Sequence, residues 1–139
     1  MSERKVFLDT GFAIAMVSPR DVYHGRAIQL ADELNAARTA IITTRAVLLE
    51  IGAALAKAAY REAAVSLIDL LENDPQVEIL PLSDDLFAQA FELFRARTDK
   101  EWSLADCLSF VVMRQCGVQA ALAADAHFQQ AGFKALLLE

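Results

Sequence analysis

Hydrophobic and polar residues follow one another along this chain in patterns that switch between the period of a strand and the period of a helix. Residues 104–113 show the helical period, with apolar side chains at positions 104, 107, 108, 111 and 112. This spacing is typical of a helix that packs one face against a core. Phe110 and Met113 lie on the opposite side, so we expect a helix that is buried nearly all round.

Short, largely apolar runs predict strands. They cover residues 5–8, 40–42, 77–80, 120–124 and 135–138. Between them, amphipathic or capped segments predict helices. These cover residues 12–17, 22–37, 43–57, 61–73, 83–97, 104–116 and 126–131. Because strands and helices alternate, the chain should form right-handed crossovers and a parallel sheet with helices on both faces.

Length and composition limit the classes of protein that fit. A chain of 139 residues suits one domain with a real core, so we expect residues 1–139 to form a single domain. Hydrophobic residues make up 55% of the chain, which indicates apolar surface used for an oligomer or a tight partner. The sequence lacks both an apolar run of the roughly 18 residues that span a membrane and a signal-peptide pattern. We therefore expect a cytoplasmic protein without membrane contact.

The net charge and the two cysteines limit the kinds of binding and catalysis that fit this chain. The formal net charge of −6 argues against a coat that binds nucleic acid regardless of sequence, because such proteins carry a basic surface. It is compatible with a metal-dependent enzyme, since bound cations offset acidic side chains. Cys107 and Cys116 lie nine residues apart in one predicted helix. That spacing fits neither a zinc motif nor a disulfide framework, so we expect both to be core thiols.

The predicted helices over residues 43–73 contain many small side chains. Gly52 and five alanines within residues 46–58 would let another backbone approach closely. Together with the apolar excess, this pattern predicts that the helix pair is an interface.

Four of the 19 acidic residues stand apart from all other charges: Asp9, Glu50, Asp106 and Asp125. Each is the only charged side chain in an apolar window of at least ten residues, and each lies at a predicted strand end or in the first turns of a helix. Ligands of parallel sheets bind beyond the carboxyl ends of the strands, so this fold could bring all four acids to one edge. Clustered carboxylates repel one another unless a cation neutralises them, and an all-oxygen site favours Mg²⁺ or Mn²⁺ over zinc.

Each acid also has a purely structural interpretation. Three of them could form local caps or turns: Asp106 in a capping box with Ser103, Asp9 in an Asx-turn and Asp125 at a helix N-cap. Glu50 could pair with a basic residue of its own helix. Four such coincidences are needed to explain all four acids in this way, whereas one shared metal site explains them together.

Several segments resemble the PIN domain, in particular the VapC-type toxins of prokaryotic toxin–antitoxin pairs. They are LDTGFAIAM near the N-terminus, TTRAVLLEIGAAL in the middle, and DKEWSLADCLSF followed by AADAHFQQAGF. The resemblance covers almost the whole chain. It implies a PIN-like fold, a three-layer α/β/α sandwich with a five-stranded parallel sheet.

The resemblance also implies a set of functional residues. The acidic ligands of the family fall on the four isolated acids, Asp9, Glu50, Asp106 and Asp125. Thr10, the polar residue after the first acid, would orient a ligand or a phosphate. Asp99 resembles an accessory acid of the family, although it could equally be a solvated partner of Lys100.

The activity that the resemblance implies is that of an Mg²⁺- or Mn²⁺-dependent endoribonuclease, the toxin of a type II toxin–antitoxin pair. One or two ions held by the four acids would activate a water molecule for in-line attack on an RNA phosphodiester. Arg45, Arg97 or Lys100 could contact the RNA backbone, or could simply belong to the surface. His24 and His127 are weaker candidates, and we expect His127 to have a packing or capping role.

The partners implied are RNA as substrate, a cognate antitoxin that covers the acidic pocket with a basic side chain, and a second copy in a homodimer. Other classes of protein fit less well. A receiver-type signalling domain needs paired acids after its first strand, and here Leu8 precedes Asp9. A haloacid dehalogenase-type phosphatase needs D-x-D, and residue 11 is glycine. A degenerate PIN-like module that only binds remains an alternative.

Overall fold

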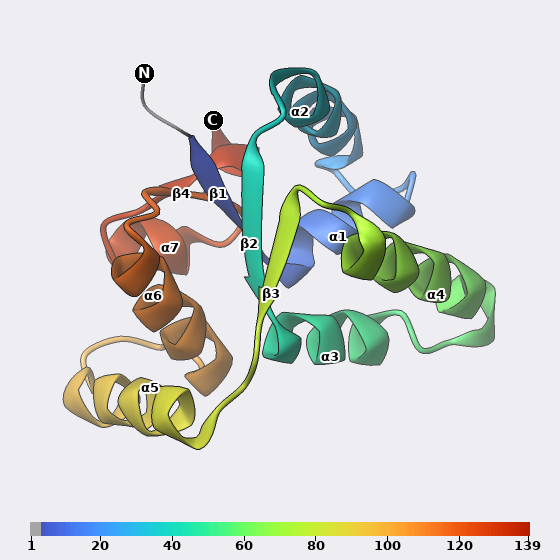
Figure 1. The fold of residues 1–139 in the computed structure, drawn as a ribbon. Coiled ribbons are helices and arrows are strands. Elements are labelled where there is room, and N and C mark those ends of the chain that lie inside the picture. Colours follow the sequence, from blue (N-terminus) through green and yellow to red (C-terminus); the bar gives the residue numbers. More distant parts are fainter. Residues whose placement is uncertain (1–3) are drawn as a thin grey trace.

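The structure, a computed structural model, describes residues 4–139. Within these residues lies a five-stranded sheet in the order β3-β2-β1-β4-β5, in which every neighbouring pair is parallel. The strands are β1 (Lys5–Leu8), β2 (Ala40–Thr44), β3 (Val77–Leu80), β4 (Ala120–Leu122) and β5 (Lys134–Ala135). Figure 1 shows the strands running in one direction, toward the end of the molecule where α3 begins.

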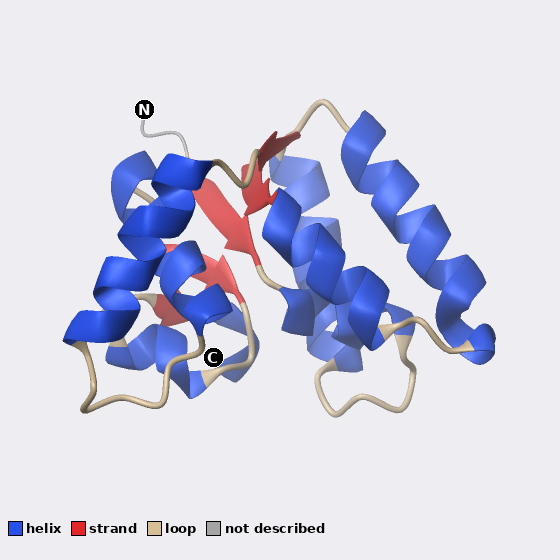
Figure 2. Cartoon of the chain, turned by 90° about the horizontal axis from the view of Figure 1, so that it is seen from below, coloured by secondary structure: helices blue, strands red, loops and turns tan. Residues whose placement is uncertain are grey.

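Helices cover both faces of the sheet, as Figures 1 and 2 show. One layer consists of α1 (Thr10–Val17), α2 (His24–Ala37), α3 (Arg45–Ala54) and α4 (Ala58–Asn73). The other consists of α5 (Asp84–Ala96), α6 (Leu104–Cys116) and α7 (Ala126–Gln130). The predicted α/β/α sandwich with its parallel sheet is confirmed.

The end of the sheet differs from the prediction. Instead of a strand over residues 135–138, the chain forms the two-residue strand β5 and then a 3-10 helix, Leu136–Leu138. The backbone N–H of Leu137 donates to the carbonyl of Ala123 at 3.1 Å, which draws the chain away from the strand direction. The same bond uses a backbone group just beyond β4, which ends at Leu122 rather than at residue 124.

The junction between α3 and α4 also differs from the prediction. We predicted a helix to residue 57 and another from residue 61, whereas α3 ends at Ala54 and α4 begins at Ala58. The side chain of Arg61 donates to the carbonyl of Ala56 at 2.9 and 2.7 Å, and this contact holds the turn between the two helices. Where a helix ends here depends on tertiary contacts, which the spacing of apolar residues along the sequence does not reveal.

The aromatic core lies between α6, α7 and the sheet. Phe110 of α6 is fully buried and makes edge-to-face contacts with Trp102 and Phe128, each with ring centroids 5.0 Å apart. As predicted, α6 is buried nearly all round. Cys107 is a buried free thiol, whereas Cys116 is only half-buried. These contacts fix α6 and α7 against each other at the edge where both begin.

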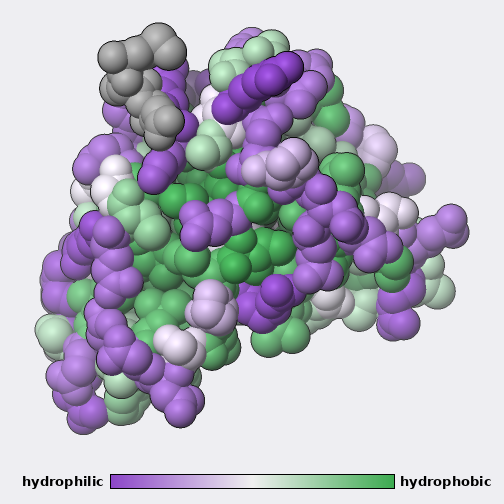
Figure 3. Space-filling model, viewed as in Figure 1, coloured by the Kyte–Doolittle hydropathy of each residue, from purple (hydrophilic) through white to green (hydrophobic). Residues whose placement is uncertain are grey.

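Parts of the sheet lie near the surface. Figure 3 shows hydrophobic residues in the middle of the face that Figure 1 presents, around β2 and β3, with hydrophilic residues at its border. The edge strand β3 is accordingly only half-buried. Within residues 4–139, no helix combines the length and apolar character required to cross a membrane.

Candidate active site

The isolated acids gather at the carboxyl edge of the sheet. Parallel strands end at one edge, and the helices that follow them begin there. Asp9 lies between β1 and α1, and Asp125 lies between β4 and α7. Glu50 belongs to α3, which follows β2 directly, and Asp106 lies in the first turn of α6. Segments far apart in sequence therefore bring carboxylates to the same part of the molecule.

Threonines hold the strand ends that carry the first two acids. Thr43 donates from its hydroxyl to the carbonyl of Leu8 at 2.8 Å, which joins the ends of β1 and β2. Thr44 caps α3 by accepting from the backbone N–H of Val47 at 3.2 Å. Thr10 donates its hydroxyl to Oε1 of Glu50 at 3.2 Å. This last bond connects the start of α1 directly to the acid of α3.

The capping roles considered for Asp106 and Asp125 are present. Asp106 and Ser103 form a capping box, with bonds of 3.1 and 3.0 Å. Asp125 is the N-cap of α7, and its Oδ1 accepts from the backbone N–H of His127 at 2.8 Å. These bonds use Oδ2 of Asp106 and Oδ1 of Asp125. Capping therefore orients both carboxylates without removing them from the edge.

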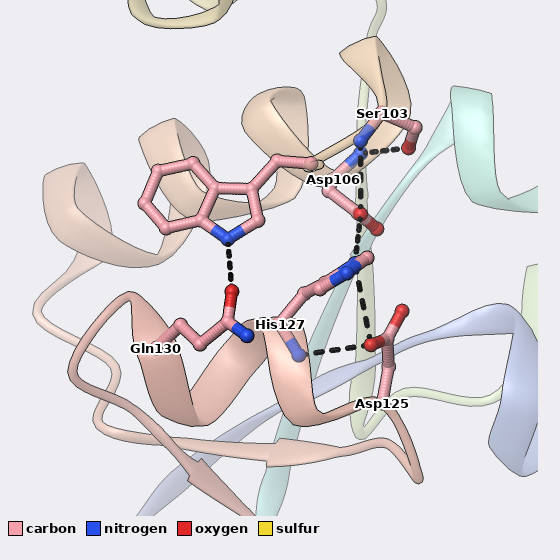
Figure 4. A network of polar contacts seen from close by, with 6 residues as sticks. Ser103, Asp106, Asp125, His127 and Gln130 are labelled. Carbon is pink, nitrogen blue, oxygen red and sulfur yellow. Dashed lines mark hydrogen bonds and ion pairs between the residues drawn. The ribbon is translucent and has the colours of Figure 1, made fainter. Parts of the chain in front are cut away.

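His127 joins the two capping acids. Its Nδ1 lies 3.0 Å from Oδ2 of Asp106 and 3.3 Å from Oδ1 of Asp125, as Figure 4 shows. One donor atom from each of these three residues lies within 4.8 Å of the others, a spacing that could hold a metal ion. The sequence predicts a packing or capping role for His127 and not this contact with both acids. The available signal was its position two residues after an N-cap acid, where a side chain can turn back toward the cap.

The pKa values reflect the crowding of negative charge. Burial raises the pKa of Asp9 to about 7, although the backbone N–H of Thr10 donates to its carboxylate and lowers it. The charges that add to the raised pKa are those of Glu50, Asp106 and Asp125. Burial also raises the pKa of Glu50, opposed by the bond from the Thr10 hydroxyl and reinforced by the charge of Asp106. The other three acids thus all lie within electrostatic reach of Asp9.

The donor set fits a hard divalent cation. In the part of the chain that the structure describes, no Lys or Arg side chain lies within 4.0 Å of any of the four carboxylates. Arg45, a possible partner of Glu50, bonds Glu72 at 2.7 Å instead. Neighbouring carboxylates without a Lys or Arg partner favour a bound cation, and their oxygens are the ligands that Mg²⁺ and Mn²⁺ prefer.

Asp99 is engaged with basic residues of its own loop. Its two carboxylate oxygens accept from Arg97 at 3.0 Å each, and Nζ of Lys100 lies 3.9 Å away. The bond from Arg97 holds the pKa of Asp99 below its usual value. The guanidinium of Arg97 also lies over the ring of Trp102. The basic residues considered for RNA contact in this loop are therefore engaged with Asp99 on the surface.

This arrangement defines the class of protein. The sequence pattern of the PIN domain matches residues 6–134, so the chain belongs to the PIN domain family. The strand order also excludes the receiver type, in which the order is 2-1-3-4-5.

Within this family, the chain is similar to the 23S rRNA-specific endonuclease VapC20 of Mycobacterium tuberculosis (strain H37Rv). The two are 32% identical over 128 residues, which cover 92% of this chain and 95% of that protein. The crystal structure of Mycobacterium tuberculosis VapC20, a sarcin-ricin loop cleaving toxin, superposes with a TM-score of 0.82 and 31% identity, over 94% of this chain and 97% of that one. The structure of FitAcB from Neisseria gonorrhoeae has a TM-score of 0.64 at 19% identity over 93% and 94% of the two chains, and shows the shared fold alone.

Proposed function

We propose that this protein is a metal-dependent endoribonuclease that acts as the toxin of a type II toxin–antitoxin pair. The observation that carries the proposal is the convergence of the isolated acids on one edge of a PIN fold, in a chain similar over almost its whole length to an rRNA endonuclease. RNA is the proposed substrate. The activity of VapC20 makes 23S rRNA the first RNA to test.

The four acids would hold one or two Mg²⁺ or Mn²⁺ ions: Asp9, Glu50, Asp106 and Asp125. A divalent ion in such a site lowers the pKa of a water molecule and stabilises the charge that develops on a phosphodiester. Asp9, with its raised pKa, gives up its proton more readily when a cation binds beside it. Thr10 orients Glu50 through its hydroxyl bond. The proposal requires no nucleophilic side chain.

An RNA cleavage assay tests this proposal. Asp9→Asn and Asp106→Asn remove one charge each from the site, and we expect both variants, and the wild type in EDTA, to lose cleavage of 23S rRNA. Asp99→Asn is the matched control, because its carboxylate pairs with Arg97 on the surface. Full activity in both site variants would refute the proposal. If the wild type neither binds Mn²⁺ nor cleaves RNA, the degenerate binding module is the better interpretation.

A protein antitoxin is the proposed partner. The uncompensated carboxylates would accept a basic side chain of that partner. An apolar cavity of about 340 Å³ between α1, α2 and α4 offers a second point of attachment, with walls that include Phe12, Met16 and Leu67. Phe12 follows Asp9 by one helical turn, so a partner segment in this cavity would lie beside the acidic edge.

We also propose a homodimer, formed through the outer face of α5. Three phenylalanines spaced along this face are exposed by 40–47%: Phe87, Phe91 and Phe94. The first turn of α5 carries Asp84 and Asp85, and its last turn carries Arg95. Two antiparallel copies of α5 would therefore bury the rings and place the acidic start of each helix beside the basic end of the other. The interface predicted from the small residues of α3 and α4 is the rival arrangement.

A further inference from the structure

His127 differs from the other histidine in what its ring contacts. Nδ1 of His24 lies 2.7 Å from the carbonyl of Ala15, which is an ordinary structural bond within one helical layer. Nδ1 of His127 lies between two carboxylates that are 19 residues apart in sequence, Asp106 and Asp125. The nitrogen therefore occupies a position where negative charge converges from two helices.

The donor distances match those around an octahedral ion. Adjacent ligands of such an ion, each about 2.1 Å from the metal, lie about 3 Å apart. The distances from Nδ1 of His127 are 3.0 Å to Oδ2 of Asp106 and 3.3 Å to Oδ1 of Asp125. One donor atom from each of the three residues lies within 4.8 Å of the others. The two distances from Nδ1 are therefore those of neighbouring positions in one coordination shell, and the third pair of donors lies close enough to join the same shell.

The imidazole is held in place and is accessible. Its backbone N–H bonds Asp125, and the next residue, Phe128, is buried against Phe110 of α6. Gln130 accepts from the indole N–H of Trp102 at 3.0 Å, which ties α7 to the segment before α6, as Figure 4 shows. The side chain of His127 is 29% exposed. An ion and its water molecules can therefore reach a ring whose position is already fixed.

We propose that His127 is a nitrogen ligand of the divalent ion held by Asp106 and Asp125, and that it makes the site prefer Mn²⁺ to Mg²⁺. The inference rests on the proposed function, because it concerns the same ion. Ligation through Nδ1 uses the neutral tautomer that carries its proton on Nε2. Mg²⁺ favours oxygen ligands almost exclusively, whereas a transition metal ion accepts imidazole nitrogen, so one nitrogen in the shell favours Mn²⁺.

Pulsed electron paramagnetic resonance of the Mn²⁺-loaded protein tests ligation without reference to activity. The wild type should show the modulation of a directly bound ¹⁴N nucleus, and labelling the histidines with ¹⁵N should change it to the ¹⁵N pattern. His127→Gln should abolish the nitrogen signal. His24→Gln is the matched control and should retain it, since the chain has only two histidines. Melting temperatures of both variants identify any loss of folding.

Calorimetric titration with Mn²⁺ and Mg²⁺ provides the second measurement. We expect His127→Gln to weaken Mn²⁺ binding by about tenfold or more, and Mg²⁺ binding by much less. Mn²⁺ binding without a nitrogen signal in the wild type would overturn the role of His127 and leave the metal site intact. An equal loss of affinity for both ions in His127→Gln would also overturn the role of His127 as a ligand. That result is expected of a residue that only positions the carboxylates. Failure of the wild type to bind Mn²⁺ would overturn this inference together with the proposed metal dependence.

Discussion

At the scale of single residues, the acids of this site lower the stability of the protein when no cation is bound. Asp9 lies at the end of β1, where burial and three neighbouring carboxylates raise its pKa to about 7 from a usual value of 3.8. The folded protein therefore binds this proton more tightly than the unfolded chain does. The stabilising contribution of the protonated form is complete below about pH 4 and is lost as the pH rises through 7.

We predict that Asp9→Asn stabilises the metal-free protein at pH 8. The amide carries no charge, so the free energy of unfolding of the variant relative to the wild type should increase between pH 5 and pH 8, by at most about 3 kcal/mol. Urea unfolding at several pH values in EDTA measures this difference. Saturating Mn²⁺ should stabilise the wild type more than the variant. A difference that does not change with pH would show that the charge of Asp9 carries no such penalty.

Thr10 offers a second prediction at this scale. Its hydroxyl bond to Glu50 is one of the interactions that oppose the raised pKa of that acid. Thr10→Val should raise the pKa of Glu50 further and weaken metal binding by about 10- to 100-fold, as is usual when the hydrogen-bond partner of a ligand is removed. Thr10→Ser keeps the hydroxyl and should bind metal as the wild type does. Equal affinities in Thr10→Val and the wild type, measured by calorimetry, would contradict this role.

At the scale of elements, α5 and α6 differ in how much of their apolar surface the chain itself covers. The apolar residues of α6 are buried nearly all round, and its N-terminus is satisfied by the capping box of Ser103 and Asp106. One face of α5 packs on α6, with Leu86 and Ala90 buried, while its phenylalanine face remains exposed. Arg95 lies over the ring of Phe91, 4.6 Å from its centroid, and covers part of that face. An exposed aromatic face on a well-packed helix is the usual sign of an interface.

We predict that Phe91→Glu converts a homodimer into a folded monomer. The ring is exposed, so its replacement should leave the fold and the melting temperature of the monomer nearly unchanged, while two glutamates at the dimer axis repel each other. Light scattering after gel filtration measures the mass. Leu49→Glu is the control, because Leu49 is 66% exposed on α3, in the other helical layer. If Leu49→Glu produces the monomer and Phe91→Glu does not, the interface lies on α3 and α4 as the small residues of that pair indicate.

At the scale of the whole molecule, one edge of the sheet carries the acids while apolar surfaces lie on both helical layers. The cavity between α1, α2 and α4 belongs to one layer and the exposed face of α5 to the other. A protein partner in the cavity and a second copy on α5 could thus bind at the same time. In such an arrangement the protein partner, and not the second copy, would decide whether RNA can reach the acidic edge.

We predict that expression of this protein alone stops the growth of its host, because an uncontrolled endoribonuclease inactivates RNA on which translation depends. Co-expression with the protein encoded by the neighbouring gene should restore growth, and Asp9→Asn should be harmless without it. Growth curves after induction, with immunoblots to match protein levels, measure both effects. Harmless accumulation of metal-binding wild-type protein would count against a toxin.

Much of the fold and part of the site follow from local patterns. The periodicity of apolar side chains correctly predicts the strands near residues 5, 40 and 77 and the buried helix after Leu104. Burial of one or both faces of an element requires apolar residues at regular positions, and this spacing can be recognised in the sequence. The isolated acids were recognisable because an unpaired charge within an apolar run requires a compensating partner. The short last strand and its 3-10 turn were not predicted, because they depend on a bond from Leu137 to Ala123.

The sequence by itself determined where most of the strands and helices form and which acids stand apart from all other charges, because both are properties of a residue and its near neighbours. Only the tertiary structure decided which polar groups meet. It placed the ring of His127 between Asp106 and Asp125, joined Thr10 to Glu50, and paired Asp99 with Arg97. Contacts of this kind depend on how helices begin and pack at the edge of the sheet, over distances that no local pattern records.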